Sequence, residues 1–77
     1  MRCRIVFYDL AEKWEGALDS SSPLSCREAA ARLLEQKGRN PDALRGVIFL
    51  VDHERRQADS PLADGECLQV HRLLGGG

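Results

Sequence analysis

The first part of the chain alternates between apolar and polar positions with the period of two that a β-strand requires. Residues 2–9 form one alternating segment and residues 13–19 form a second, with a short connection at residues 10–12 between them. The pattern therefore predicts an N-terminal hairpin with one face turned toward the core. The core-facing residues of its first strand are Cys3, Ile5 and Phe7.

A helix is predicted over residues 26–37, where strong helix formers follow one another. Ser25 is followed three residues later by Glu28, which is the spacing of a capping box at a helix start. Gly38 comes directly after this segment and is expected to end the helix in a left-handed conformation. The helix has one apolar stripe, so we expect it to cover one face of a sheet.

The second half of the chain predicts three more strands. A turn at residues 40–42 precedes a continuously apolar strand at residues 47–51, and a short edge strand is expected near residues 56–58. The last strand spans residues 67–73, with Leu68 and Val70 facing the core. This order predicts an α+β fold in which one helix packs on a four- to five-stranded mixed sheet. With the first and last strands as parallel neighbours, that arrangement is the β-grasp.

The composition of the chain limits the classes of protein to which it could belong. The 77 residues carry 11 Lys and Arg against 12 Asp and Glu, which gives a net charge of −1. This balance argues against a nucleic-acid-binding protein, which would need a strongly basic domain. No apolar run approaches the roughly 20 residues that cross a membrane. Because so small a body has little room for a catalytic cleft, we expect a carrier, a modifier or an interaction module without a cofactor, not an enzyme.

The cysteines and histidines form no recognisable metal or disulfide pattern. Cys3, Cys26 and Cys67 are odd in number and show no C-x-x-C spacing, so the pattern favours reduced side chains in the cytoplasm. Cys26 lies in the first turn of the predicted helix, the one feature here that would favour a reactive thiol. His53 and His71 have no third ligand beside them, so we expect no metal site.

The last five residues, 73–77, are predicted to form a flexible tail beyond a domain of residues 1–72. This segment ends in three glycines, Gly75, Gly76 and Gly77. Glycine loses more conformational entropy on folding than any other residue type, and it has no side chain to pack. Fully extended, the tail would reach roughly 16–18 Å. A chain without Cβ atoms can thread a narrow channel, so the tail suits a carboxylate that must reach a nucleotide inside another protein. The alternative is a frayed end without a role.

The order of elements, the length and the ending Arg72-Leu73-Leu74-Gly75-Gly76-Gly77 resemble the ubiquitin-like superfamily. The segment Pro61-Leu62-Ala63-Asp64-Gly65-Glu66 is similar to prokaryotic sulfur carriers of molybdopterin and thiamine biosynthesis, which have a Leu-x-Asp-Gly-Asp/Glu turn before the last strand. The chain departs from these patterns by a third glycine and by the absence of a proline near the tail. The combination looks most like a bacterial ubiquitin-like modifier.

The resemblance implies that the C-terminal carboxylate is the functional group. An activating enzyme would consume ATP to adenylate it, and an enzyme cysteine would then carry it as a thioester to an amine of a target protein. The implied partners are this activating enzyme, a conjugating enzyme, a deconjugating peptidase and the covalent target. Two alternatives stay open: a sulfur carrier that forms a thiocarboxylate, and a non-covalent ubiquitin-like interaction module. The chain itself performs no catalysis in any of them.

Two surfaces are predicted on the body. The first is a positive docking site for the activating enzyme at the root of the tail. It comprises Arg2, Arg4, His71, Arg72, Leu73 and Leu74. The second is an exposed apolar patch on the outer sheet face, which either a partner protein or a second copy would bury. It comprises Val6, Tyr8, Ile48 and Leu50.

Only two lysines, Lys13 and Lys37, accompany the N-terminal amine as acceptors for conjugation. With so few acceptors, we expect the chain to be attached mainly to other proteins and not to itself.

Overall fold

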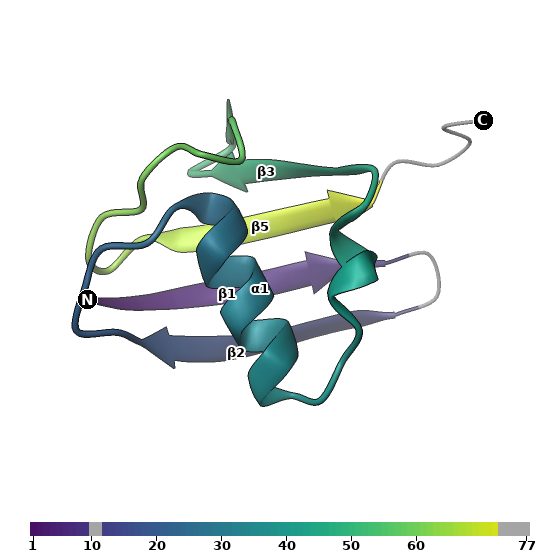
Figure 1. The fold of residues 1–77 in the computed structure, drawn as a ribbon. Coiled ribbons are helices and arrows are strands. Elements are labelled where there is room, and N and C mark those ends of the chain that lie inside the picture. Colours follow the sequence, from purple (N-terminus) through teal and green to yellow (C-terminus); the bar gives the residue numbers. More distant parts are fainter. Residues whose placement is uncertain (10–11, 73–77) are drawn as a thin grey trace.

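A mixed five-stranded sheet forms one layer of the structure and a single α-helix crosses it in the other (Figure 1). The computed structural model describes residues 1–9 and 12–72. The elements in chain order are β1 (Arg2–Tyr8), β2 (Lys13–Asp19), α1 (Cys26–Gln36), the 3₁₀ helix η1 (Pro41–Leu44), β3 (Val47–Val51), β4 (Glu54–Arg56) and β5 (Cys67–Arg72). No helix in these two ranges is long and apolar enough to span a membrane.

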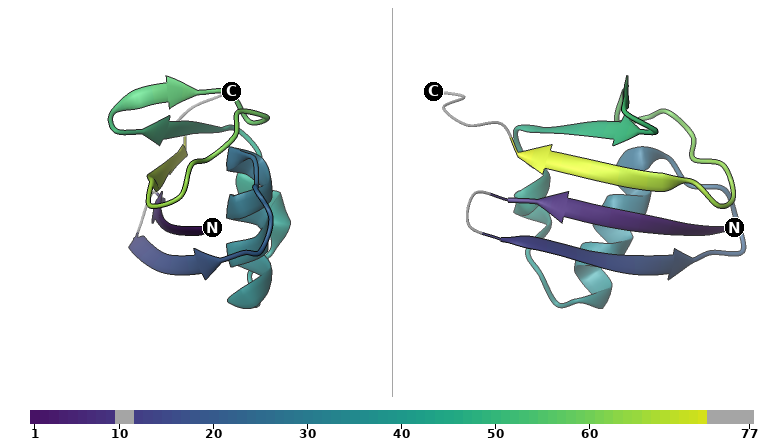
Figure 2. Two further views of the ribbon diagram at one scale, coloured as in Figure 1. Left: turned by 90° about the vertical axis from the view of Figure 1, so that its left-hand side faces the viewer. Right: turned by 180° about the vertical axis from the view of Figure 1, so that it is seen from behind.

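The strands lie in the order β2-β1-β5-β3-β4. β1 and β5 are parallel neighbours in the middle of the sheet, and every other neighbouring pair is antiparallel. Figure 2 shows α1 on one face only, with the other face of the sheet open. The predicted α+β arrangement of one helix on a mixed sheet, with the first and last strands parallel, is therefore confirmed.

The core lies between α1 and the inner face of the sheet. The inward residues of β1 predicted from the alternation are all buried, as are Leu68 and Val70 of β5. The helix begins with the predicted capping box, in which the Ser25 hydroxyl accepts the Glu28 backbone N–H at 3.1 Å. The Ser25 N–H in turn donates to the Glu28 carboxylate at 3.0 Å. Gly38 adopts φ 68° after the helix end, as predicted.

One local prediction is wrong. The edge strand lies at Glu54–Arg56 and not at residues 56–58, because β3 turns back through only two residues. Those residues, Asp52 and His53, both have positive φ, as the central residues of a type I′ hairpin turn require. The predicted turn at residues 40–42 is confirmed, because the Ala43 N–H donates to the Asn40 carbonyl at 3.1 Å. The turn continues as η1, where the Asn40 side chain accepts the Asp42 N–H at 2.9 Å.

Candidate functional site

The strand that leads into the tail ends at Arg72, an exposed residue. The Arg72 guanidinium lies 3.6 Å from the carboxylate of Asp9, which directly follows β1. Val47, the first residue of β3, pairs with Arg72, so β5 has a neighbouring strand up to its last residue. The predicted tail residues Leu73, Leu74, Gly75, Gly76 and Gly77 lie outside the described part of the chain.

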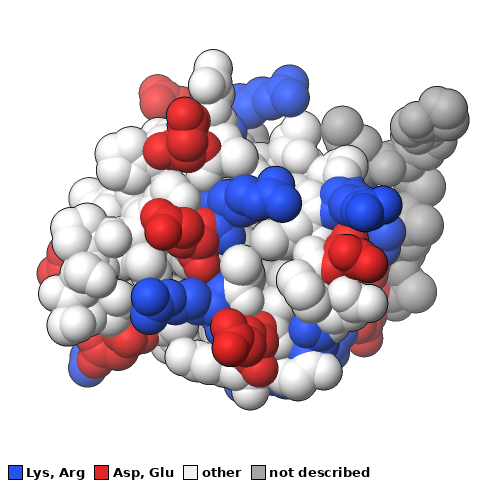
Figure 3. Space-filling view, in the orientation of Figure 1, with Lys and Arg blue, Asp and Glu red and all other residues white. Residues whose placement is uncertain are grey.

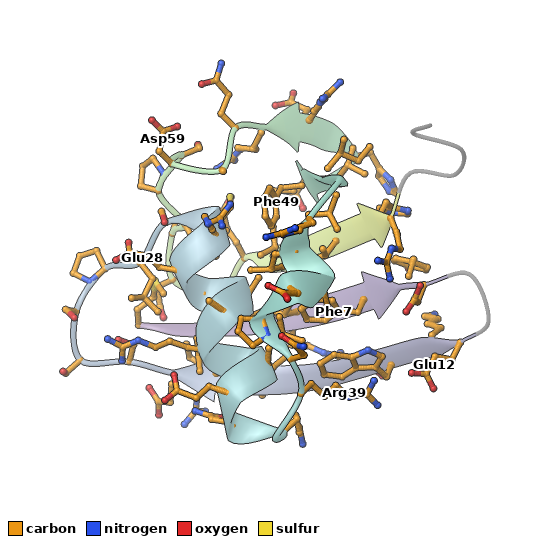
Figure 4. All side chains as sticks on the ribbon, turned by 45° about the vertical axis from the view of Figure 1, so that its right-hand side comes forward. Phe7, Glu12, Glu28, Arg39, Phe49 and Asp59 are labelled. Atoms are coloured by element: carbon orange, nitrogen blue, oxygen red, sulfur yellow. The ribbon has the colours of Figure 1, made fainter. Side chains whose placement is uncertain are left out.

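A hollow of about 250 Å³ opens at this end of the sheet, beside η1 and Arg72. Phe7 and Trp14 stack in its wall, with parallel rings whose centroids are 4.3 Å apart. The Arg39 guanidinium lies 4.2 Å from the centre of the Trp14 ring and forms an ion pair with Glu12 at 2.9 Å. Figure 4 shows Phe7, Arg39 and Glu12 at the same end of the sheet. These contacts hold the loop after α1 against the start of β2.

Trp14 is half-buried and packs against the edge of the core. The sequence analysis did not predict the hollow or the stacking of Arg39 on Trp14. An aromatic residue such as Trp14 is the one feature of the sequence that could have indicated this site. Arg39 lies in a loop far from Trp14 in the sequence, and only the folded chain brings the two side chains together.

The predicted positive docking site is not assembled as expected. β1 and β5 run parallel, so Arg4 pairs with Cys67, and His71 pairs with Tyr8. Four residues of strand, roughly 13 Å, therefore separate Arg4 from the row of His71. Arg2 lies still farther from the tail end, beside Asp19. Placing Arg2 and Arg4 at the root of the tail was wrong.

The charges at the root of the tail are also balanced. Asp9 and Glu12 pair with Arg72 and Arg39, so two carboxylates accompany the two guanidinium groups. Arg4 likewise pairs with Glu15 on β2, at 2.6 Å. On the helix side of the molecule, acidic and basic side chains are interspersed (Figure 3). The two guanidinium groups that line the hollow, Arg39 and Arg72, are thus each paired with a carboxylate.

The outer face of the sheet carries the predicted apolar patch in two rows. In the first row Tyr8, His71 and Ile48 are successive neighbours, and the Tyr8 and His71 rings stack with centroids 4.3 Å apart. In the second row the neighbours are Val6, Gln69 and Leu50. Both Ile48 and Leu50 therefore belong to this face, which no helix covers in the view from behind (Figure 2).

Val6 differs from the other patch residues. Tyr8, Ile48 and Leu50 are half-buried, but Val6 is only 7% exposed. It lies at the centre of the sheet with the longer side chains of Glu15 and Gln69 on either side. The prediction that Val6 is an exposed patch residue is wrong, and Val6 forms the floor of the patch.

The turn that resembles sulfur carriers has a structural role. Asp64 accepts the backbone N–H of Arg2 at 2.6 Å, and Gly65, with φ 85°, donates to the Arg2 carbonyl at 2.7 Å. Glu66 accepts the N–H of Ala63 at 2.6 Å and pairs with Arg56 at 3.1 Å. These bonds tie the start of β1 and the end of β4 to the turn before β5. The motif is therefore explained by the fold, and no function is needed to account for it.

The cysteines are free thiols. Burial raises the pKa of the Cys3 and Cys26 thiols above the usual value, which favours the unreactive protonated form. Cys26, the one cysteine with a feature favouring reactivity, is fully buried. The residues described in ranges 1–9 and 12–72 contain no cluster of three or more side chains that could hold a metal ion.

The three amines differ in availability. Lys13 and Lys37 are exposed, and the Lys13 ammonium lies 5.4 Å from the centre of the Tyr8 ring on the outer face. The N-terminal amine is half-buried and donates a hydrogen bond to the Ser20 carbonyl. Ser20 N–H in turn donates to the Met1 carbonyl at 2.7 Å. The N-terminal amine is therefore held against the sheet edge, and the two lysines are the freer acceptors.

No protein-family model and no curated protein matches the chain. Solved structures do match it. SAMP1 from Haloferax volcanii shares 14% identity over 100% of both chains, with a TM-score of 0.71. A ubiquitin-like protein from the hyperthermophilic archaeon Caldiarchaeum subterraneum shares 14% identity over 99% of this chain and 100% of its own, with a TM-score of 0.56. At this level of identity the likeness concerns the fold alone.

Proposed function

We propose that this chain, which has the ubiquitin-like β-grasp fold, is a protein modifier activated at its C-terminal carboxylate. One observation carries the proposal: β5 ends exposed at Arg72, and the next five residues in the sequence are two leucines and three glycines. The strand holds the root of this segment on the body, while glycines without Cβ atoms suit passage into a narrow active site.

The chemistry would proceed in three steps on partner enzymes. An oxygen of the terminal carboxylate attacks the α-phosphorus of ATP, and pyrophosphate leaves. The thiolate of an enzyme cysteine then attacks the acyl carbon of the adenylate, and AMP leaves. Finally an amine of the target attacks the thioester, an amide bond forms, and the enzyme thiol leaves while the amine loses its proton. The chain supplies only the carboxylate and the surfaces that enzymes recognise.

Arg72, His71, Leu73 and Leu74 remain the proposed docking residues for the activating enzyme. The side chains of Arg72 and Asp9 are 42% and 40% exposed, and an ion pair this exposed contributes at most about 1 kcal/mol. An acidic group of the enzyme can therefore replace Asp9 as the partner of Arg72. A conjugating enzyme, a deconjugating peptidase and a target protein complete the proposed set of partners, in the cytoplasm, where the free cysteines remain reduced.

A sulfur carrier would share the first step, after which a sulfur nucleophile displaces AMP and leaves a thiocarboxylate. The feature that favoured this alternative was the turn at Asp64, Gly65 and Glu66, which is explained by its hydrogen bonds to β1 and β4. We therefore propose the protein modifier as the function and keep the sulfur carrier as the alternative.

ATP–pyrophosphate exchange with the cognate activating enzyme tests the first step. Replacing Gly76 and Gly77 by alanine should abolish exchange while circular dichroism shows an intact fold. Ser21→Ala, an exposed change in the loop after β2, is the control and should leave exchange unchanged. Undiminished exchange in the folded double variant would contradict the proposal.

Mass spectrometry of the products separates the alternatives. Isopeptide-linked target peptides would support the modifier. Free chain whose mass shows replacement of one oxygen by sulfur would support the carrier. No modification of the tail in cells that contain the enzymes would leave a non-covalent interaction module.

A further inference from the structure

We propose that the outer face of the sheet binds a second copy of this chain, in a two-fold dimer whose axis runs along β5. This inference is independent of the tail chemistry. It rests on how residues of the outer face are ordered across the five strands.

One row of outward-facing residues crosses the whole sheet and ends in opposite charges. Its members, from β2 to β4, are Glu15, Val6, Gln69, Leu50 and Arg55, each paired with the next. Glu15 and Arg55 are both exposed. Arg55 forms no ion pair within the part of the chain that the structure describes. The row thus has an acidic end that pairs with Arg4 but stays half exposed, an apolar and amide middle, and an unpaired basic end.

A two-fold axis in the plane of the interface and parallel to the strands makes this row complementary to itself. With the axis over the central strand β5, the operation places β2 against β4 of the second copy and β1 against β3. Glu15 then faces Arg55 of the second copy, and Val6 faces Leu50. In the neighbouring row Tyr8 faces Ile48, so apolar positions meet apolar positions. Such an isologous interface uses the same surface on both copies.

The residues on the axis also suit a symmetric contact. Gln69 lies on β5 and faces Gln69 of the second copy, and a side-chain amide can donate to and accept from an identical amide. Two sheets that pack face to face keep their strands within about 30° of each other, which an axis close to the strand direction satisfies. An axis perpendicular to the strands would instead oppose Arg55 to Arg55 and Glu15 to Glu15, so the charges select the first arrangement.

The dimer is expected to be weak. Tyr8, Ile48 and Leu50 are already half-buried in the single chain, and Val6 is almost fully buried, so little further apolar surface is removed from water. An interface of this kind lies at the small end of specific contacts, where association is transient. It should therefore be observed as a concentration-dependent equilibrium.

Sedimentation equilibrium of the full chain, up to about 1 mM, tests the proposal with three variants and one control variant. Glu15→Arg and Arg55→Glu each oppose like charges twice in the dimer and should each weaken association at least about tenfold. The double variant E15R/R55E restores opposite charges at both contacts and should associate about as strongly as the wild type. Glu54→Arg is the matched control, because Glu54 neighbours Arg55 but lies on the other side of β4, and it should have no effect.

The outcomes are distinct. A wild type that stays monomeric throughout the series overturns the proposal. If the double variant associates as weakly as the single variants, the proposed position of the two-fold axis is wrong. Of the two axes considered, only the one along β5 places position 15 opposite position 55. Glu15→Arg also removes the ion pair with Arg4, so thermal unfolding must show that each variant is folded. If that variant does not fold, Arg55→Glu, which breaks no ion pair, still tests the interface.

Discussion

Replacing Glu66 by alanine should destabilise the fold by about 2–3 kcal/mol. The Glu66 carboxylate accepts the Ala63 N–H at 2.6 Å and binds the Arg56 guanidinium at 3.1 Å. The side chains of Glu66 and Arg56 are only 18% and 28% exposed, so water replaces their ion pair poorly. The change would leave a half-buried cation without its acceptor, whereas water can bind the Ala63 N–H in the exposed turn.

The magnitude follows from the bonds that are lost. A hydrogen bond to a charged group contributes about 1.5–3 kcal/mol, so two would contribute at most about 3–6 kcal/mol. Residual exposure reduces this sum, and Arg56 keeps its hydrogen bond to the Pro61 carbonyl at 3.3 Å. The expected loss is therefore about 2–3 kcal/mol, which in a domain of this size lowers the melting temperature by roughly 10–20 °C.

Urea unfolding followed by circular dichroism measures this loss, and two variants control for its cause. Glu66→Gln keeps an acceptor oxygen for the Ala63 N–H but removes the charge, so it should lose only about 1 kcal/mol. A double-mutant cycle with Arg56→Ala should show coupling of about 1 kcal/mol or more, because the two side chains are in contact. If Glu66→Ala lay within about 0.5 kcal/mol of the wild type, the pair would be no stronger than a surface one and the reasoning would be refuted.

Other exposed positions test separate parts of the structure. His53→Gly should stabilise the fold by about 0.5–1 kcal/mol in urea unfolding, because glycine adopts φ 68° without the steric cost that histidine has there. Bonding to the Ser25 N–H lowers the pKa of the Glu28 carboxyl, so its stabilisation is present above the unfolded-state pKa and is lost as pH falls through the lower folded value. Glu28→Gln should flatten that decline in acid unfolding curves. Asp9→Asn should speed association with the activating enzyme in stopped-flow measurements, since it frees Arg72, whereas Arg72→Glu should slow it and flatten its salt dependence.

Local chemistry was sufficient to predict much of the fold. The capping box of Ser25 and Glu28 involves residues three apart, and Gly38 ends the helix through its own backbone freedom. The burial of Leu68 and Val70 follows from alternation within one strand. In each case the residues that determine the structure lie within a few positions of one another in the sequence.

Most of the incorrect predictions concern features set by pairing between distant segments. The position of β4 is the exception, because it depends on the local turn at Asp52 and His53. The alternation showed that Arg4 and His71 face outward, but only the parallel register shows that they occupy different rows. Alternation likewise placed Val6 on the outer face, whereas its burial depends on the neighbours supplied by β2 and β5. The stacking of Arg39 on Trp14 has the same origin, because a loop after the helix meets the second strand only in the folded chain.

The central position of β5 has a consequence for how the protein is made. β5 separates β1 from β3 in the sheet, so a chain that lacks β5 contains only two hairpins with no strand to join them. Such non-local pairing is slow to form, and a ribosome makes the residues of β5 after those of the other strands and the helices described here. A nascent chain therefore cannot complete its sheet until residue 72 has been synthesised. Prematurely terminated products would expose unpaired strand edges and would be degraded by proteases. The chains that persist would therefore be those that contain β5, the strand that leads into the C-terminal segment.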